Sequence, residues 1–417
     1  MKFFKLFIAI LLSFGYAICF SVDSRSQVSD GEKIVYQEAP VGIDDITNGH
    51  VSQEFFNKGI GLFRKHFIDR EGLGPIFNGE MCTRCHQFPT IGGSGLIMVI
   101  RAGIFDGKNF KSPIDGTVIQ TNAIPPQIRK TVQPDFNVVT NRMPTSMLGD
   151  GFIEAIDDST IRAIAAEQPK ISKGKIAGEI IEVPVIESPG KTRVGRFGWK
   201  NSHASIFSFV AEALRNELGV TSEFYPNEIS FFGKSVAEFD RAKDPEIDKS
   251  KINLIADFIR STKSPENYSK KIKSSEMLEG DKIFTSIGCA ICHVPTIKTA
   301  AVGTVINGGA FKVTDALGNK IVHPYSDFLL HDVGTGDGIL ETNNPSSRNK
   351  IRTAPLWGIG ARLEKLKDNL LWLHNGSAKN LTEAILKHRG EAATVTEGFQ
   401  KLPEEKKRLL MKFLESL

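Results

Sequence analysis

The feature that most constrains this chain is a five-residue pattern that occurs twice. Both copies have the form Cys-x-x-Cys-His and together use every cysteine after residue 21: Cys82, Cys85 and His86 in the first, Cys289, Cys292 and His293 in the second. Two thiols separated by two residues can form thioether bonds to the two vinyl groups of one haem, and the next histidine can then bind the iron. The pattern therefore predicts two covalently bound haem c groups, with His86 and His293 as iron ligands.

The four cysteines have three alternative uses. In an oxidising compartment they could close two small disulfide loops, but this leaves the histidine after each pair unexplained. A four-cysteine zinc site would not use the histidines either, and would require the two pairs to converge across about 200 residues. A thioredoxin-like redox pair is expected within a βαβ unit, and the pattern around neither pair predicts one. Haem attachment is the interpretation that uses both histidines.

The N-terminus has the pattern of an export signal. Two lysines stand at the start of the chain, and an apolar run extends from Leu6 to about Phe20, which is short for a membrane span. We expect residues 1–21 to be a signal peptide and the mature protein to reside in the periplasm. Cys19 then belongs to the discarded peptide; lipidation of Cys19 and membrane anchoring are the alternative. No later stretch is apolar over enough residues to predict a transmembrane span.

The length and patterning of the chain predict two haem domains. After a polar arm at residues 22–50, we expect the first domain at 51–265 and the second at 270–417. Apolar residues at helical spacing precede each motif, as is typical of cytochrome c-like domains. The first domain is too long for a minimal domain of this kind, and β-branched runs between 97 and 200 predict a β-rich insertion. The expected fold is therefore mainly α, with two cytochrome c-like haem domains and a β-rich insertion in the first.

The second domain carries the clearest local signals. Apolar spacing predicts a helix that ends at Gly288, directly before the second motif. Short apolar runs at Phe311–Val313 and Ile321–Val322 flank a glycine turn and predict a hairpin. Leucines and a phenylalanine between Leu409 and Leu417 share one face and predict a final amphipathic helix.

What fills the sixth coordination position of a haem iron decides between electron transfer and catalysis. For the second haem, Asn380 can cap a helix on which Leu381, Ile385 and His388 share one face. His388 is therefore a candidate ligand, and a buried structural histidine is the alternative. For the first haem, the spacing does not choose between an open position, which would suit a reaction with peroxide, and four candidate ligands: Met143, Met147, Lys200 and His203.

Five segments together resemble the bacterial di-haem oxidoreductase, putative peroxidase family, some of whose members are called thiol oxidoreductases. They are residues 149–156 (GDGFIEAI), 195–200 (GRFGWK), 330–334 (LHDVG), 352–360 (RTAPLWGIG) and 373–392 (LHNGSAKNLTEAILKHRGEA). The resemblance covers nearly all of the chain after residue 50. The family is distantly related to the di-haem cytochrome c peroxidases and the MauG-type enzymes.

The resemblance implies a division of labour between the haems. In those peroxidases the C-terminal haem relays an electron and the other haem meets hydrogen peroxide, and His388 stands in the place of the relay haem's distal ligand. By local similarity, Trp199 matches a tryptophan between the haems. Glu217 matches an acid over the open haem, where it could move a proton between peroxide oxygens. A packed core tryptophan and a surface glutamate are the alternatives for these two residues. The relatives also imply a calcium ion, whose ligands cannot be located in this sequence.

These patterns lead to one functional hypothesis and one alternative. We expect a periplasmic di-haem c-type cytochrome that acts in electron transfer as a peroxidase-like oxidoreductase, with peroxide as its substrate. Its electron donor would be a small redox protein or another periplasmic donor. The alternative is a non-catalytic electron-transfer cytochrome whose haems are both six-coordinate. No basic stripe with interleaved aromatic residues occurs, so we expect no nucleic-acid partner.

Overall fold

The computed structural model describes residues 34–265 and 274–417. The predicted signal peptide and the first part of the predicted arm, residues 22–33, lie outside the described residues. The rest of the arm includes strand β1 (Gln37–Glu38), which pairs in parallel with β13 (Lys320–Val322). Tyr36–Leu417 form one compact unit. The domain boundaries expected from the sequence stay a prediction.

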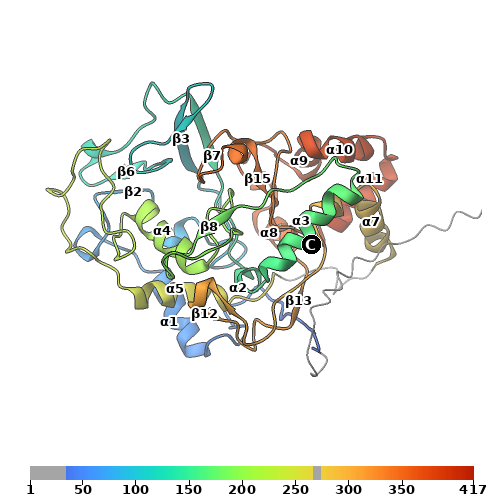
Figure 1. The fold of residues 1–417 in the computed structure, drawn as a ribbon, viewed down its shortest axis with the longest axis horizontal. Coiled ribbons are helices and arrows are strands. Elements are labelled where there is room, and N and C mark those ends of the chain that lie inside the picture. The colour runs from blue at the N-terminus through green and yellow to red at the C-terminus, as the bar shows by residue number, and fades with distance from the viewer. Residues whose placement is uncertain (1–33, 266–273) are drawn as a thin grey trace, which may run out of the picture. The chain divides into compact units, whose positions relative to one another are not determined.

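The helices are short and form two groups. In Figure 1, α1, α4 and α5 lie together on one side, and α7, α9, α10 and α11 lie together on the other. The described α-helices are α1 (Gln53–Phe63), α2 (Asp150–Glu154), α3 (Asp158–Ile171), α4 (Ile206–Leu218), α5 (Lys249–Arg260), α7 (Ser275–Ser286), α8 (Ile359–Leu366), α9 (Leu381–Leu386), α10 (Ala393–Gln400) and α11 (Glu404–Leu414). Each motif forms a 3-10 turn beside one group, at Cys82–Arg84 and Cys289–Ile291.

Helix α1 packs on α5 in the core beside the first motif. It begins where the Ser52 hydroxyl accepts a hydrogen bond from the backbone N–H of Phe55, and its apolar residues recur every three or four positions. The rings of Phe56 and Phe63 contact the ring of Phe258 on α5, with centroids 5.3 and 5.2 Å apart. The amphipathic helix expected before the first motif is thus present.

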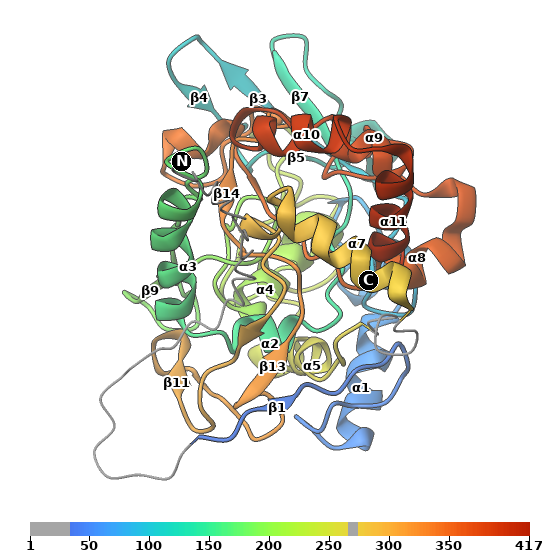
Figure 2. The same cartoon turned by 90° about the vertical axis from the view of Figure 1, so that its right-hand side faces the viewer.

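Helices α7 and α11 lie side by side next to the second motif (Figure 2). Phe284 of α7 packs edge-on against Phe413 of α11, with ring centroids 5.4 Å apart. The close approach depends on Gly280, because an added Cβ would lie 2.4 Å from the carbonyl oxygen of Leu409. After α7, Gly288 has a φ of +100°, which glycine adopts without strain and which turns the chain into the motif. The helix predicted directly before the second motif is confirmed.

Gly280→Ala is expected to lower the free energy of unfolding by about 1–3 kcal/mol, because the new methyl group overlaps the backbone of α11 and the two helices must separate. Denaturant unfolding followed by circular dichroism measures the change. Gly61→Ala on α1 is the matched control, since nothing lies within 4 Å of its added Cβ. This control should gain about 0.5–1 kcal/mol from helix propensity. Equal effects of the two substitutions would contradict the close packing of α7 on α11.

The strands form several small sheets. The largest is antiparallel and places β3 between β5 and β7, with β4 pairing to the far end of β3. The remaining strands pair in twos or threes. Besides β1 and β13, the described strands are β2 (Ile76–Phe77), β3 (Val99–Phe105), β4 (Phe110–Lys111), β5 (Val118–Ile119), β6 (Asn122–Ala123), β7 (Val138–Arg142), β8 (Glu182–Pro184), β9 (Thr192–Val194), β10 (Ile297–Lys298), β11 (Val305–Ile306), β12 (Phe311–Lys312), β14 (Leu330–His331) and β15 (Ile351–Arg352).

The expected mainly α fold of two cytochrome c-like domains is wrong. Helices contain 33% of the residues and strands 15%, so about half of the chain lies in turns and loops. Strands occur between residues 97 and 200 as predicted, but helix α3 lies there too, and further strands follow the second motif. The physical reason is the frequency of chain breakers: 38 glycines and 19 prolines interrupt the apolar runs before they can form long helices.

The predicted hairpin around Gly318 is also wrong. Strand β12 pairs with β11, whereas β13 pairs with β10 and β1. The loop between β12 and β13 hydrogen-bonds at both ends to residues 300–304: the Val313 N–H donates to the Thr304 carbonyl, and the Asn319 N–H donates to the Ala300 carbonyl. These bonds draw each strand toward a partner in the preceding segment.

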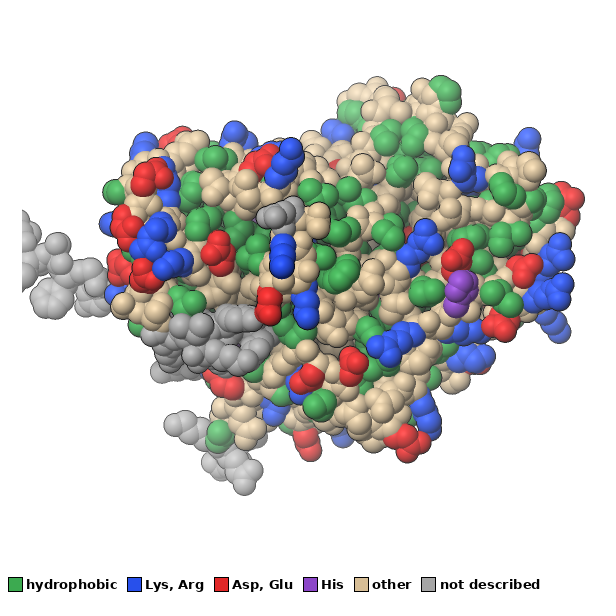
Figure 3. All heavy atoms as spheres, turned by 180° about the vertical axis from the view of Figure 1, so that it is seen from behind, with side chains coloured by type: hydrophobic (Ala, Val, Ile, Leu, Met, Phe, Trp, Pro, Cys, Tyr) green, Lys and Arg blue, Asp and Glu red, His purple; other side chains and the backbone are tan. Residues whose placement is uncertain are grey.

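The surface carries charges of both signs. Figure 3 shows Lys and Arg side chains interspersed with Asp and Glu side chains over one face, with hydrophobic side chains scattered between them. Among the helices of the described residues, none combines the length and the apolar character needed to span a bilayer.

Candidate haem sites

The first motif lines a cavity, called here the first cavity. Its other walls come from α1, α4 and α5, which contribute apolar side chains such as Phe63, Leu214 and Ile259. Cys82, Cys85 and His86 line it together. The 3-10 turn through the motif brings the three side chains to one wall, because its backbone N–H groups bond back to the Cys82 carbonyl.

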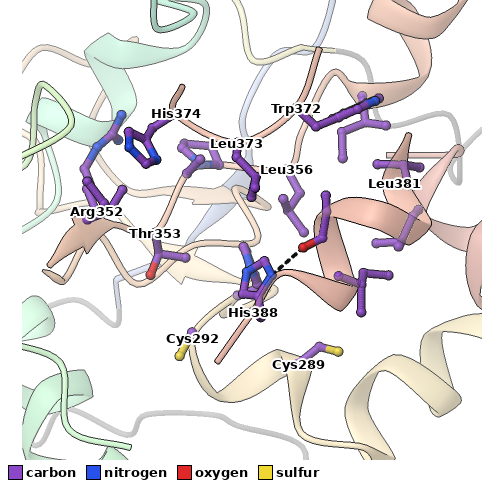
Figure 4. A pocket seen from close by; sticks show the side chains of 18 of the residues that line it. Cys289, Cys292, Arg352, Thr353, Leu356, Trp372, Leu373, His374, Leu381 and His388 are labelled. Atoms are coloured by element: carbon purple, nitrogen blue, oxygen red, sulfur yellow. Dashed lines mark hydrogen bonds between the residues drawn. The ribbon is translucent and has the colours of Figure 1, made fainter. Parts of the chain in front are cut away.

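The second motif lines a separate cavity, the second cavity, whose walls include residues from α7, α8, α9, α10 and α11. Cys289, Cys292 and His293 line it, as does His388. Figure 4 shows His388 in the middle of this cavity, with the two cysteines on one side. The structure therefore brings together residues that lie about 95 positions apart in the chain.

Helix α9 positions His388. The Asn380 side chain accepts a hydrogen bond from the Glu383 N–H at 2.8 Å, so the predicted cap is confirmed. The helix ends at Leu386, and His388 follows one residue after the C-cap. Its ring still turns into the cavity because its Nδ1 lies 2.8 Å from the Ala384 carbonyl oxygen (Figure 4).

The two motif histidines and His388 share one hydrogen-bonding arrangement. Nδ1 contacts a backbone carbonyl oxygen in each: Gly93 for His86 at 3.0 Å, Tyr325 for His293 at 2.9 Å, and Ala384 for His388 at 2.8 Å. A carbonyl oxygen can only accept, so Nδ1 must carry the proton and the Nε2 lone pair is free for a metal.

Burial keeps these imidazoles neutral. It lowers the pKa of His86 and of His388, and lowers the pKa of His293 to about 4. Near neutral pH each ring is therefore unprotonated at Nε2, which is the state that binds a metal ion.

The residues present fit haem c, and the other uses of the cysteines do not match the structure. The four described cysteines form no disulfide. Within residues 34–265 and 274–417, neither of the two groups with metal-ligand spacing contains more than one cysteine, so a four-cysteine zinc site is absent there. Burial raises the pKa of Cys82 and of Cys289 to about 12, whereas reactive thiol pairs have a lowered pKa.

Two of the candidate sixth ligands for the first haem have other partners. The Lys200 ammonium donates to three backbone carbonyls within residues 347–350, at 2.7–3.2 Å. Both ring nitrogens of His203 are also engaged, with the Ser208 hydroxyl at 2.9 Å and the Glu212 carboxylate at 2.6 Å. Neither side chain lines the first cavity. The two thioether candidates, Met143 and Met147, do line it.

Trp199 lines both cavities. Its indole Nε1 donates to the Met143 carbonyl at 2.7 Å, and its ring meets His374 edge-on, with centroids 5.9 Å apart. The side chain thus borders both cavities, and its role between two haems stays a prediction.

Glu217 stands near the end of α4 and lines the first cavity. Its Oε2 accepts a hydrogen bond from the Asn78 side chain at 2.8 Å. Burial raises the pKa of its carboxyl above the ordinary value, with Arg101 opposing the rise. The carboxyl group thus adjoins the cavity that also holds Cys85 and His86.

A buried charge network beside Trp199 could not be found from the sequence. Asp337 accepts from Arg142 Nε at 2.8 Å and lies 3.3 Å from the Lys200 ammonium, and Glu341 lies 2.7 Å from both Arg101 and Arg142. Burial opposes ionisation of Glu341, but the two arginines lower its pKa to about 2. These residues come from segments up to about 240 positions apart and share no spacing signal.

His331 lies next to the second motif between two carboxylates. Its Nε2 is 2.8 Å from Asp327, its Nδ1 is 2.9 Å from Glu391, and Cys292 Sγ is 3.9 Å from Nδ1. Although burial disfavours the charged ring, Asp327 raises the pKa of His331 well above its ordinary value. The sequence does not reveal this cluster, because neither acid is adjacent to His331 in the chain.

Four acidic residues away from both cavities offer one carboxylate oxygen each within 4.8 Å of one another: Glu228, Asp240, Asp244 and Glu246. Such oxygens are the ligands that calcium prefers. None of the four residues lines either cavity, and the calcium ion implied by the resemblance stays a prediction.

A comparison with protein families finds one match. The model described as "Di-haem oxidoreductase, putative peroxidase" matches residues 100–417, which include the second motif and begin after the first. Similar solved structures include a hydrazine synthase from Kuenenia stuttgartiensis, 13% identical with a TM-score of 0.38, over 94% of this chain and 100% of that chain. Another is a MauG-like protein associated with microbial copper homeostasis, 16% identical with a TM-score of 0.41, over 94% and 95%. No curated protein matches the chain.

Proposed function

The chain belongs to the di-haem oxidoreductase, putative peroxidase family, and from that premise we propose that it is a periplasmic peroxidase whose two covalently bound haems have different roles. A haem held at the second motif would supply electron relay, and a haem held at the first motif would supply the redox chemistry for hydrogen peroxide. The two cysteine pairs would attach these haems, His86 would bind the first iron, and His293 and His388 would bind the second.

The observation that carries this proposal is the unequal supply of nitrogen ligands. In the second cavity, His293 and His388 each have Nδ1 on a backbone carbonyl and a free Nε2. His374 also lines this cavity, and its Nε2 lies 3.7 Å from the Asp337 carboxylate. The first cavity holds His86, while Lys200 and His203 are held by other partners. A bis-histidine iron has no position for a substrate and suits electron transfer, whereas an iron with an open position can bind peroxide.

Glu217 is proposed to handle the protons. Reduction of hydrogen peroxide to two water molecules consumes two electrons and two protons, and a bound haem supplies the redox-active iron. The carboxyl group of Glu217 lines the first cavity and is held in place by Asn78. Its raised pKa brings it closer to neutral pH, where a carboxyl group can both give and take a proton.

Trp199 is proposed to connect the two haems, because its side chain lines both cavities. Electrons would enter at the second haem from a small redox protein or another periplasmic donor and pass the indole on their way to the first haem. The hydrogen bond from Nε1 to Met143 fixes the orientation of the ring.

Spectroscopy of the first haem tests the proposal. We expect one low-spin and one high-spin haem in optical and EPR spectra, together with peroxide-dependent oxidation of a reduced donor. Glu217→Gln should lower kcat about 10²–10⁴-fold, because the variant cannot transfer a proton. The exposed Glu223, changed to Gln, is the matched control and should leave turnover unaltered.

Two low-spin haems in both redox states, with no reaction with peroxide, would show instead a non-catalytic electron-transfer cytochrome. Met143 or Met147 would then be the ligand to test, because both side chains line the first cavity.

A further inference from the structure

The second cavity contains two arginines that have no anionic partner at hydrogen-bond distance among the described residues. Arg352, on β15, is 6% exposed, and the only hydrogen bond that its side chain makes in the described structure runs from Nε to the Gly198 carbonyl at 2.9 Å. Arg362, on α8, lines the same cavity, and its Nε is buried with no hydrogen-bond partner among the described residues. Its guanidinium lies 5.5 Å from the ring centroid of Trp372.

A buried and a half-buried cation in this condition destabilise the protein unless an anion joins them, because each has lost hydration without gaining a counter-charge. Burial lowers the pKa of both guanidinium groups to about 10. The charge of Asp150 opposes the fall in the pKa of Arg352, but burial raises the pKa of Asp150 itself to about 7. The described residues therefore leave this cavity short of negative charge.

The first cavity does not share this feature. Arg142 contacts both Asp337 and Glu341, and Arg101 contacts Glu341 at 2.7 Å. Its arginines are largely neutralised by carboxylates of the chain itself. The missing anion is thus specific to the second cavity.

On the basis of the proposed function, we infer that Arg352 and Arg362 bind the propionate carboxylates of the haem at the second motif. Haem propionates leave the porphyrin at the edge away from the vinyl groups that form the thioethers. Figure 4 shows Arg352 across the cavity from Cys289 and Cys292, with His388 between them. Guanidinium groups match carboxylates with paired hydrogen bonds, and these two arginines have no such bonds among the described residues.

Positive charges on the wall of the cavity favour the reduced iron, which carries one positive charge less. Arg352→Gln should lower the equilibrium constant for reduction of the low-spin second haem about tenfold, a fall of about 59 mV in its midpoint potential. It should also shift the propionate bending bands in the resonance Raman spectrum. Arg352→Lys keeps the charge, so most of the potential should return while the bands stay shifted.

Arg362→Gln is a second, independent variant that should also lower the midpoint potential of the second haem. It keeps the test decisive if Arg352→Gln does not fold. Arg408→Gln is the control, because this exposed arginine pairs with Glu276 and Glu405 outside both cavities. If Arg352→Gln and Arg362→Gln both fold with two haems per chain and show unchanged midpoint potentials and Raman bands, this inference is overturned and the proposed function is not. A wild-type protein without a haem at the second motif would overturn the proposed function instead.

Discussion

Replacing Cys289 and Cys292 together by alanine is expected to halve the covalent haem content, from two per chain to one. The pair would supply both thioether bonds of the second haem, and the second cavity offers no other thiol among its lining residues. Pyridine haemochrome absorbance per chain and the intact mass of the protein both measure the loss. Peroxide-dependent turnover should also disappear, because the proposed relay to the first haem is gone.

The matching exchange of Cys82 and Cys85 to alanine is the control for this experiment. It should also leave one haem per chain, but the haem that remains should be the low-spin one. Two haems retained in either double variant would show that the cysteines do not attach them. No covalent haem in the wild-type protein would exclude c-type attachment altogether.

His388→Ala is expected to convert the second haem from low spin to high spin. The ring lines the same cavity as His293, and its Nδ1 is committed to the Ala384 carbonyl, so Nε2 is the nitrogen available to the iron. Without it, the iron keeps His293 and loses the imidazole of His388; His374, which also lines the cavity, lies 3.7 Å through its Nε2 from Asp337. Optical and EPR spectra of the oxidised protein measure the change, and added imidazole should restore the low-spin form by filling the vacated position.

The control for His388→Ala is His323→Ala. His323 contacts Thr296 and Glu38 and lines neither cavity, so its loss should not alter the spectrum. An unchanged spectrum in His388→Ala would remove His388 as an iron ligand and leave it as a buried structural residue.

Features that depend on neighbouring residues could be predicted well. The spacing of each motif, the helix that ends before Gly288 and the cap at Asn380 are all set within one or two turns of the chain. Local steric and hydrogen-bonding preferences decide such elements, so the residues themselves carry the signal.

Features that depend on distant residues could not be predicted from the sequence. Lys200 and His203 were reasonable ligand candidates by type, but their partners, the carbonyls of residues 347–350 and the carboxylate of Glu212, decide that they are held elsewhere. The wrong hairpin has the same origin, since residues 300–304 bind the ends of the loop. The mainly α prediction was wrong for two reasons. Glycines and prolines interrupt the apolar runs, and packing selects the short helices and small sheets as much as propensity does.

The sequence by itself determined the two Cys-x-x-Cys-His motifs and the candidate partner His388, because the spacing that predicts haem attachment lies within five consecutive residues. Only the tertiary structure decided that the motifs line separate cavities, that Trp199 borders both, and that Arg352 and Arg362 line the second without a counter-ion among the described residues. Those facts depend on which distant segments pack together, and burial then fixes the charge state of each group. The different surroundings of two motifs with the same spacing are therefore a property of the fold.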